Sequence, residues 1–285
     1  MLTIRVLETP QEMEQAEQLQ ALVWPGSDID VVPGHLMLTA AHNGGLLLGA
    51  YEDGQMLGML FGFIGLYDTP AGSRPKHCSH QMGVHPHARD AGIGFALKQA
   101  QWQIVRKQGL DLITWTYDPL LSRNAHLNIA RLGAVCNTYL RDVYGEMRDG
   151  LNAGLSSDRF QVDLWVNTSH VERHMQAARR PSLSLRELEV AGARLLYPVE
   201  PAGNLIRPPG QLKLPDERLL LAEIPSDFPG LKDADFKLAS DWRFFSREVF
   251  ESCFAAGYPV TDFVYDTSSG RPRSFYVLTH GGLTP

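Results

Sequence analysis

The stretch that most constrains this chain is residues 81–98, "QMGVHPHARDAGIGFALK". A short apolar run ends at a proline, a basic residue follows, and two glycines one residue apart lead into a helical pattern. Glycine accepts unusual backbone dihedrals and leaves no Cβ in the way of a ligand. A helix N-terminus presents unpaired N–H groups and a partial positive charge. The stretch therefore predicts a strand, an anion-binding bend and a helix, although a simple strand-to-helix turn stays open.

Two common phosphate motifs do not account for this bend. A Walker loop requires GxxxxGK[S/T], which the sequence lacks. A dinucleotide fingerprint requires a third glycine, but Gly92-Ile93-Gly94 is followed by Phe95, Ala96 and Leu97. A phosphate site at this bend would therefore be of a different kind.

Composition limits the class of protein. The 285 residues are 44% hydrophobic and 20% charged, which is typical of a soluble globular chain. A net charge of −6 argues against nucleic acid or an anionic membrane as partner. The three cysteines are far apart and no apolar run approaches the roughly 20 residues of a membrane helix, so we expect a cytoplasmic protein without disulfides.

The hydrophobic periodicity of residues 1–166 predicts the order β-α-α-β-β-β-α-β-α-β-β. Thr9-Pro10-Gln11-Glu12 is a capping box that starts the first helix, and Asp53-Gly54 is a tight-turn signal inside a hairpin over 45–66. The remaining strands are expected at 2–7, 76–84, 110–118, 136–144 and 159–166, and the remaining helices at 35–42, 92–109 and 122–133.

The C-terminal part differs from the first in composition. A polar, proline-rich stretch over 168–216, including 197–215 as a loop or extended connection, precedes a strand at 218–225, a helix at 233–256 and two final strands. We therefore expect a first domain over 1–167, a connecting region over 168–216 and a β-α-β-β region over 217–285. The same element order occurs in 110–166. A degenerate partial repeat of the first domain and an unrelated extension both fit, and a repeat would lack the glycine bend and hence catalysis.

The motif "GVHPHARDAGIG" resembles the acyl-CoA-binding motif of the GNAT superfamily of acetyltransferases, and the element order of 1–166 resembles the same fold. "SRNAHLNIARLGAV" resembles the second motif of the family. "WTYDPLLSRNAHLNIARLGA", with "YGEMRDGLN" and "SSDR", is similar to a poorly characterised subgroup. The resemblance implies a mixed α/β (α+β) fold, a mixed sheet flanked by helices, followed here by the C-terminal β-α-β-β region.

The resemblance also implies binding roles for residues of this sequence. The backbone of Met82, Gly83 and Val84 would pair with the pantetheine arm of acetyl-CoA or another acyl-CoA. The N–H groups of six residues would hold the diphosphate: Arg89, Asp90, Ala91, Gly92, Ile93 and Gly94. Asn124 and Asn128 would face the co-substrate from the next helix. One position departs from the family, because Ile129 stands where many members have a tyrosine that acts as general acid.

Acyl transfer to an amine requires a base. His80, on the strand before the bend, is the first candidate, with a hydrogen-bonded sheet histidine as the alternative. Asp118 is the second candidate, although it also suits a cap of the following turn. Tyr139 and Tyr144 could replace the missing acid or be ordinary packing residues. Asp158 and Arg159 could bind a substrate charge or pair with each other.

Other chemistry is less well supported. His85 and His87, with His77 and His80, suggest zinc, but no carboxylate or cysteine is spaced to complete the site, so we expect no metal. Cys78 shares a predicted strand face with His80, which makes a Cys–His nucleophile conceivable, whereas buried free cysteines are usually inert.

The sequence therefore predicts an acyl-CoA-dependent N-acyltransferase that transfers an acyl group, in the first instance acetyl, to an amine or peptide acceptor in a ternary complex. The alternative is a non-catalytic acyl-CoA-binding or regulatory protein on the same fold. A homodimer could form through an edge strand near 159–166.

Overall fold

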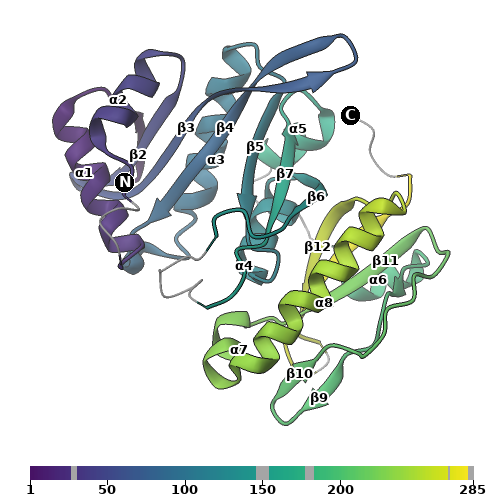
Figure 1. Ribbon diagram of the computed structural model, residues 1–285. Helices are drawn as coiled ribbons and strands as arrows, with labels where there is room; N and C mark the ends of the chain where they lie inside the picture. The colour runs from purple at the N-terminus through teal and green to yellow at the C-terminus, as the bar shows by residue number, and fades with distance from the viewer. Residues whose placement is uncertain (27–30, 146–153, 177–182, 269, 282–285) are drawn as a thin grey trace. The chain divides into compact units, whose positions relative to one another are not determined.

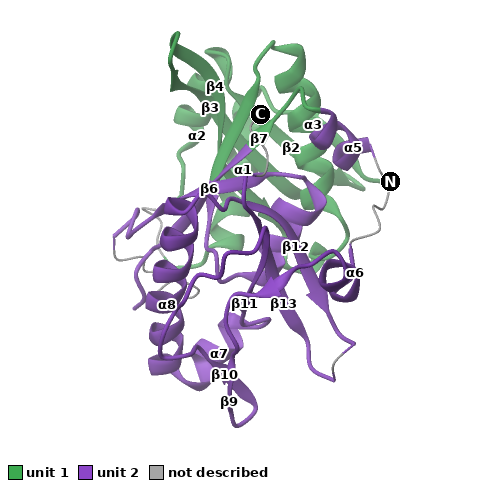
Figure 2. Ribbon diagram, turned by 90° about the vertical axis from the view of Figure 1, so that its right-hand side faces the viewer, with its two compact units in different colours: residues 1–115, 148–153, 164–168 green, residues 116–147, 154–163, 169–285 purple. Residues whose placement is uncertain are grey.

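The chain forms two compact units, coloured separately in Figure 2. The computed structural model describes residues 1–26, 31–145, 154–176, 183–268 and 270–281. Unit 1 holds the described residues up to 115 and residues 164–168, and unit 2 holds 116–145, 154–163 and the described residues from 169 onward. No helix in these described ranges is long and apolar enough to cross a membrane.

Unit 1 contains the predicted first half of the fold in the predicted order. Its elements are β1 (Thr3–Val6), α1 (Pro10–Val23), α2 (Gly34–His42), β2 (Leu46–Glu52), β3 (Gln55–Thr69), β4 (Gly72–Val84), a 3-10 turn (Pro86–Ala88), α3 (Ile93–Lys107) and the start of β5 (Leu112–Tyr117).

The sheet of unit 1 has the order β1-β2-β3-β4-β5. The pairs β1–β2, β2–β3 and β3–β4 are antiparallel, and the pair β4–β5 is parallel. Two apolar clusters hold the helices on opposite faces. Met13, Leu19 and Met37 of α1 and α2 pack on one face, and Ile93 and Leu97 of α3 pack on the other. The three helices can be followed beside the sheet in Figure 1.

Local sequence signals explain where the first elements begin and turn. The Thr9 side chain accepts a hydrogen bond from the Glu12 N–H, and the Glu12 carboxylate accepts from the Thr9 N–H, so the predicted capping box is confirmed. Asp53 and Gly54 have φ of 50° and 83°, the conformation of a two-residue hairpin turn between β2 and β3. The capping box thus sets the start of α1, and the turn joins β2 to β3.

Unit 2 contains the rest of the chain. Its elements are the end of β5, α4 (Ser122–Ala125), a π-helical turn (His126–Arg131), β6 (Val135–Leu140), β7 (Arg159–Trp165, whose last two residues belong to unit 1), α5 (Ser169–Gln176), α6 (Leu185–Val190), β8 (Arg194–Leu195), β9 (Glu200–Ala202), β10 (Leu205–Arg207), β11 (Leu219–Ile224), α7 (Phe228–Ala234), α8 (Phe236–Ala255), β12 (Val260–Asp266) and β13 (Arg273–Thr279).

The C-terminal β-α-β-β region repeats the topology of the segment from β5 to β7. In each, the last strand in sequence lies between the other two, giving the orders β5-β7-β6 and β11-β13-β12. Strand β6 pairs with β12 through Cys136 and Val260, and each strand has a register shift directly after that residue. Strand β8 is parallel to β11, as β4 is to β5. These correspondences favour the partial-repeat interpretation.

Several sequence-based boundaries are wrong in detail. The helix expected over 233–256 begins three residues later as α8, because Asp235 ends a separate helix, α7, which was not predicted, and caps α8 through the Leu238 N–H. The expected loop over 197–215 contains the β9–β10 hairpin, and α5, α6 and β8 were not predicted. The stretch 159–166 is not an edge strand, since β7 lies between β5 and β6. Most of "YGEMRDGLN" lies outside the described residues.

Candidate functional site

The predicted anion-binding bend forms the start of α3. Arg89 is extended, Asp90 and Gly92 have left-handed φ of 69° and 79°, and α3 begins at Ile93. Gly92 is the N-cap, so no side chain caps the helix, and no acidic residue stands in its first turn. The positive end of a 15-residue helix is thus available to an anion.

Gly92 is suited to a close approach by a ligand. A Cβ built at this position would have no atom within 4 Å, so the backbone there borders open space. The φ of +79° is also one that residues with a side chain rarely adopt. The bend therefore fits a diphosphate, which needs exposed N–H groups and no side chain between them and the ligand.

The end of β4 leads into this bend. Met82 and Val84 pack against the cluster beneath α3, and a Cβ on Gly83 would meet Val23 and Trp24 on the opposite face. The pairing of β4 with β5 comprises only His77 with Ile113 and Cys78 with Thr114. The backbone from Ser79 to Val84 therefore has an edge that a pantetheine arm could use as an added strand.

His80 occupies a β-bulge. Phe61 pairs with Gln81 and Gly62 pairs with Ser79, so His80 is the extra residue of β4. Its side chain is exposed, and its ring lies 5.9 Å from the rings of Phe61 and Phe63, measured between centroids. Although part of the residue is exposed, desolvation by burial lowers the pKa of His80 below 6.5. The imidazole is therefore neutral at pH 7 and able to accept a proton.

Asp118, the second predicted base, is held in a buried ion pair in unit 2. Its Oδ1 accepts hydrogen bonds from the Leu120 N–H and from Arg243 Nη1, both at 2.9 Å, and its Oδ2 pairs with Arg243 Nη2. Both partners are almost fully buried. The predicted turn cap is thus present, and the bidentate arginine occupies both oxygens of this carboxylate.

The two predicted tyrosines lie in different surroundings. The Tyr139 hydroxyl donates to Asp158 Oδ2 at 2.8 Å, and burial raises the pKa of Tyr139 well above 10. Tyr144 is 51% exposed, and its hydroxyl lies 2.7 Å from Thr116 Oγ1. Tyr144 is therefore the more available proton donor of the two.

Asp158 and Arg159 do not pair through their charged groups. Arg159 Nη1 donates to the Asp158 backbone carbonyl at 2.8 Å, whereas Arg247 binds the Asp158 carboxylate through Nε and Nη2, each at 2.9 Å. Arg243 and Arg247, both on α8, were not predicted. No sequence signal identifies these partners, which lie 125 and 89 positions along the chain from their carboxylates.

The second family motif forms α4 and the π-helical turn. Asn124 is half-buried, whereas Asn128 and Ile129 are buried in the turn. π-Helical turns often mark functional sites. Both asparagines belong to unit 2, whereas the anion-binding bend belongs to unit 1.

The histidines considered for zinc differ in how deeply they are buried. His77 is fully buried, while His85 and His87 are outside the core with ring centroids 5.3 Å apart. Within the described ranges, no three histidine, cysteine, aspartate or glutamate side chains gather to hold a metal ion. The prediction of no metal stays a prediction.

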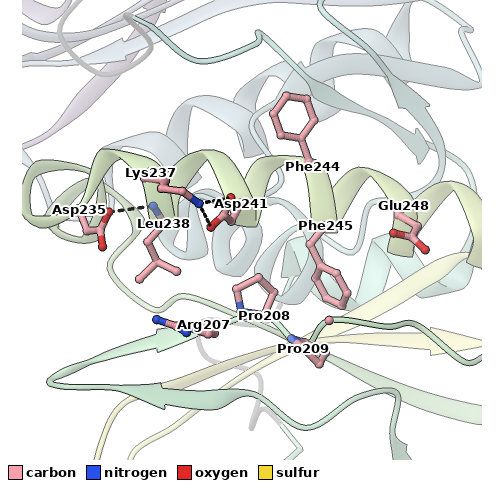
Figure 3. Close-up of a pocket in the computed structure, with 11 residues that line it drawn as sticks. Arg207, Pro208, Pro209, Asp235, Lys237, Leu238, Asp241, Phe244, Phe245 and Glu248 are labelled. Carbon is pink, nitrogen blue, oxygen red and sulfur yellow. Dashed lines mark hydrogen bonds and ion pairs between the residues drawn. The ribbon is translucent and has the colours of Figure 1, made fainter.

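A separate groove lies in unit 2 between α8 and residues 207–210, with a volume of about 600 Å³. Figure 3 shows Phe245 and Leu238 facing Pro208 and Pro209 across it, with Lys237 paired to Asp241 on the helix. None of the residues predicted for catalysis or binding lines this groove.

Residues 10–133 match the family model described as the acetyltransferase (GNAT) family. The matched range contains the β4 bulge, the glycine bend, α3 and the second motif, and residues 134–285 lie beyond it. GNAT acetyltransferases use an acyl-CoA co-substrate and an amine acceptor. No curated protein matches the chain.

Three solved structures of acetyltransferases or putative acetyltransferases are similar to part of this chain. One from Desulfovibrio desulfuricans is 19% identical, covers 58% of this chain and 99% of that one, and has a TM-score of 0.45. The ribosomal-protein-S18-alanine N-acetyltransferase of Escherichia coli is 18% identical, with coverages of 59% and 96% and a TM-score of 0.41. A Streptococcus pneumoniae acetyltransferase is 14% identical, with coverages of 57% and 98% and a TM-score of 0.44.

Proposed function

We propose that this protein transfers an acyl group, in the first instance acetyl, from acyl-CoA to an amine by direct attack in a ternary complex. The observation that carries the proposal is the uncapped start of α3 at left-handed Gly92, which directly follows a strand with a bulged, neutral histidine. A diphosphate site and a base are thus joined by one short segment of unit 1.

The binding roles follow from this geometry. The N–H groups from Arg89 to Gly94 bind the diphosphate, and the backbone from Met82 to Val84 pairs with the pantetheine arm. Asn124 and Asn128 contribute from the second motif. The same β4 backbone offers N–H groups that polarise the thioester carbonyl.

His80 serves as the base. The amine nitrogen forms a bond to the thioester carbonyl carbon, the carbon–sulfur bond breaks, and His80 takes the proton that the amine loses. Because the pKa of His80 is lowered, the imidazole is free to take that proton at neutral pH. The electron pair of the broken bond leaves with the sulfur of CoA.

The departing thiolate needs little assistance. Cysteine, a comparable thiol, has a pKa of about 8.5, so such a thiolate is a good leaving group near neutral pH. This accounts for Ile129 at the family tyrosine position, since catalysis survives without an acid there. If a donor assists, Tyr144 suits the role better than Tyr139, whose hydroxyl is bound to Asp158.

A panel of amines and N-terminal peptides tests the proposal, with release of free CoA thiol from acetyl-CoA as the readout. The proposal expects at least one acceptor to give turnover that His80→Ala abolishes while acetyl-CoA binding persists. A bound acetyl-CoA with no turnover on any acceptor would contradict it.

The second candidate function is acyl-CoA binding without catalysis. It is favoured by one observation, the buried Ile129 in place of the family tyrosine. In that case His80→Ala changes neither acetyl-CoA affinity nor any acyl transfer, because His80 has no chemical role.

A further inference from the structure

A cluster of buried polar side chains lies between α3 and β4, outside the residues assigned above. It comprises His77 and Ser79 of β4 and Lys98 and Gln101 of α3, and all four are at most 5% exposed. Such a cluster is unusual in a core because each polar group loses its contacts with water.

Lys98 is at the centre of the cluster. Its Nζ donates to Ser79 Oγ at 2.8 Å and to Gln101 Oε1 at 3.2 Å, and it lies 3.7 Å from the centroid of the Trp115 ring. Among its contacts in the described parts of the chain, none is with a carboxylate. Burial lowers the pKa of Lys98 well below 10.5.

This arrangement is costly for folding. A buried amine bound only by neutral acceptors is less favourable than an apolar side chain of the same length. Both ring nitrogens of His77 and the Nε2 of Gln101 also have no hydrogen-bond partner. The Lys98 amine is therefore not explained by stability, which points to a role in the site nearby.

The position of Lys98 supplies that role. Pairing between β4 and β5 ends at Cys78 and Thr114, and Lys98 contacts the next residue of each strand, Ser79 and Trp115. Ser79 is also the residue directly before the bulged His80. Lys98 thus ties the helix that carries the anion-binding bend to the strand at the start of the bulge.

We propose that Lys98 is a positioning residue whose hydrogen bond to Ser79 fixes the β4 bulge and thereby the orientation of the His80 ring against Phe61 and Phe63. The inference rests on the proposed role of His80 as base. It assigns Lys98 no contact with substrate.

Titration of the histidine ring signals by NMR tests the inference without any acceptor. The protein is labelled with ¹³C at histidine Cε1, and His80→Ala assigns the His80 signal. In Lys98→Met and in Ser79→Ala, the pKa of His80 is expected to rise toward 6.5, because the ring leaves its aromatic contacts and becomes more exposed to water. His85 and His87 serve as internal controls and keep their values.

Matched variants separate positioning from general damage. Ser79→Thr keeps the hydroxyl and is expected to preserve the wild-type titration of His80. Lys98→Met is expected to melt at or above the wild-type temperature, since it removes the buried amine. An unchanged His80 titration in both Lys98→Met and Ser79→Ala would overturn the inference. If Lys98→Met does not fold, Ser79→Ala alone decides.

Binding and turnover provide the second readout. In Lys98→Met the Kd of acetyl-CoA is expected to stay within about twofold, while kcat falls about 10-fold, the effect of a displaced catalytic group. If instead the affinity for acetyl-CoA falls about 10-fold while kcat is unchanged, Lys98 has a role in co-substrate binding and the inference is overturned. Failure of the wild-type protein to bind acetyl-CoA would reject the proposed function, whereas the NMR titration would still decide the position of His80.

Discussion

At the scale of single residues, His80 combines the features expected of a base. It stands at a bulge next to the predicted pantetheine-binding backbone, part of the residue is exposed, and desolvation by burial lowers the pKa of its ring. The Asp118 carboxylate, by contrast, is buried and already accepts hydrogen bonds from an arginine and a turn N–H. The environments of the two groups therefore distinguish between candidates that the sequence left open.

The first residue-scale prediction concerns the pH dependence of kcat/KM. His80 must be neutral to accept a proton, so activity is expected to fall as pH drops below its pKa, which lies below 6.5, and to be nearly constant between pH 7 and 8. His80→Gln should lose about 10²- to 10⁴-fold in kcat. Steady-state kinetics across pH on the best acceptor provide the measurement, and an acid limb that persists in His80→Gln would assign the base elsewhere.

The second residue-scale prediction concerns His77. Burial, and then the charge of Lys98, lower the pKa of His77 from 6.5 to about 4. Between these pH values the unfolded chain binds the proton and the folded chain does not, so stability is expected to fall on acidification from pH 6.5 to 4, by up to about 3 kcal/mol. Urea unfolding as a function of pH should show this slope in the wild type and lose it in His77→Leu. An identical slope in both proteins would refute the assignment.

At the scale of elements, the sequence gives the order of the first domain because its signals are local. The capping box at Thr9, the Asp53-Gly54 turn and the glycine bend each act within a few residues. The bulge at His80 and the Lys98–Ser79 bond depend on pairing with β3 and packing of α3, which no local pattern encodes. The break at Asp235 was missed because apolar periodicity continues across it.

Helix α8 contributes a buried ion pair that is expected to be essential for unit 2. Arg243→Met removes the bidentate partner of the buried Asp118 carboxylate and leaves Arg159, at 4.0 Å, as its ion-pair partner, which should cost about 3–5 kcal/mol in the free energy of unfolding. The double variant Arg243→Met with Asp118→Leu should recover part of that loss because the buried carboxylate is removed together with its bidentate partner. Chemical denaturation of the three variants measures the effect, and a single variant as stable as the wild type would show that the pair is dispensable.

At the scale of the whole molecule, the C-terminal region is built into unit 2. Phe160 of β7 lies 4.6 Å from Phe250 and 5.4 Å from Tyr276 between ring centroids, and Asp158 depends on Arg247. The boundary expected at 167 was based on the change to a polar, proline-rich sequence, and composition does not reveal contacts between residues far apart in the chain. The repeated topology explains them, because β12 pairs with β6 and the two half-repeats share a core.

A chain that ends at residue 167 is therefore expected to aggregate or to unfold without a cooperative transition, since it exposes Phe160 and removes the arginines of α8 that bind Asp118 and Asp158. Size-exclusion chromatography and thermal unfolding, with the full chain as the reference, provide the test. A soluble monomer with a sharp transition would instead support a self-sufficient domain over 1–167.

The central claim is that the start of α3 binds the diphosphate of acyl-CoA, and calorimetric titration with acetyl-CoA tests it most directly. Gly92→Glu places a carboxylate and a Cβ in the open space of the bend. Gly109→Glu is the matched control, because Gly109 has a φ of +74° and equally open surroundings at the other end of the same helix.

The wild-type protein and Gly109→Glu are expected to bind acetyl-CoA with Kd values near micromolar. Gly92→Glu is expected to weaken binding at least about 100-fold, which corresponds to more than about 2.7 kcal/mol. Equal binding by all three proteins, or no binding by the folded wild type, would contradict the central claim.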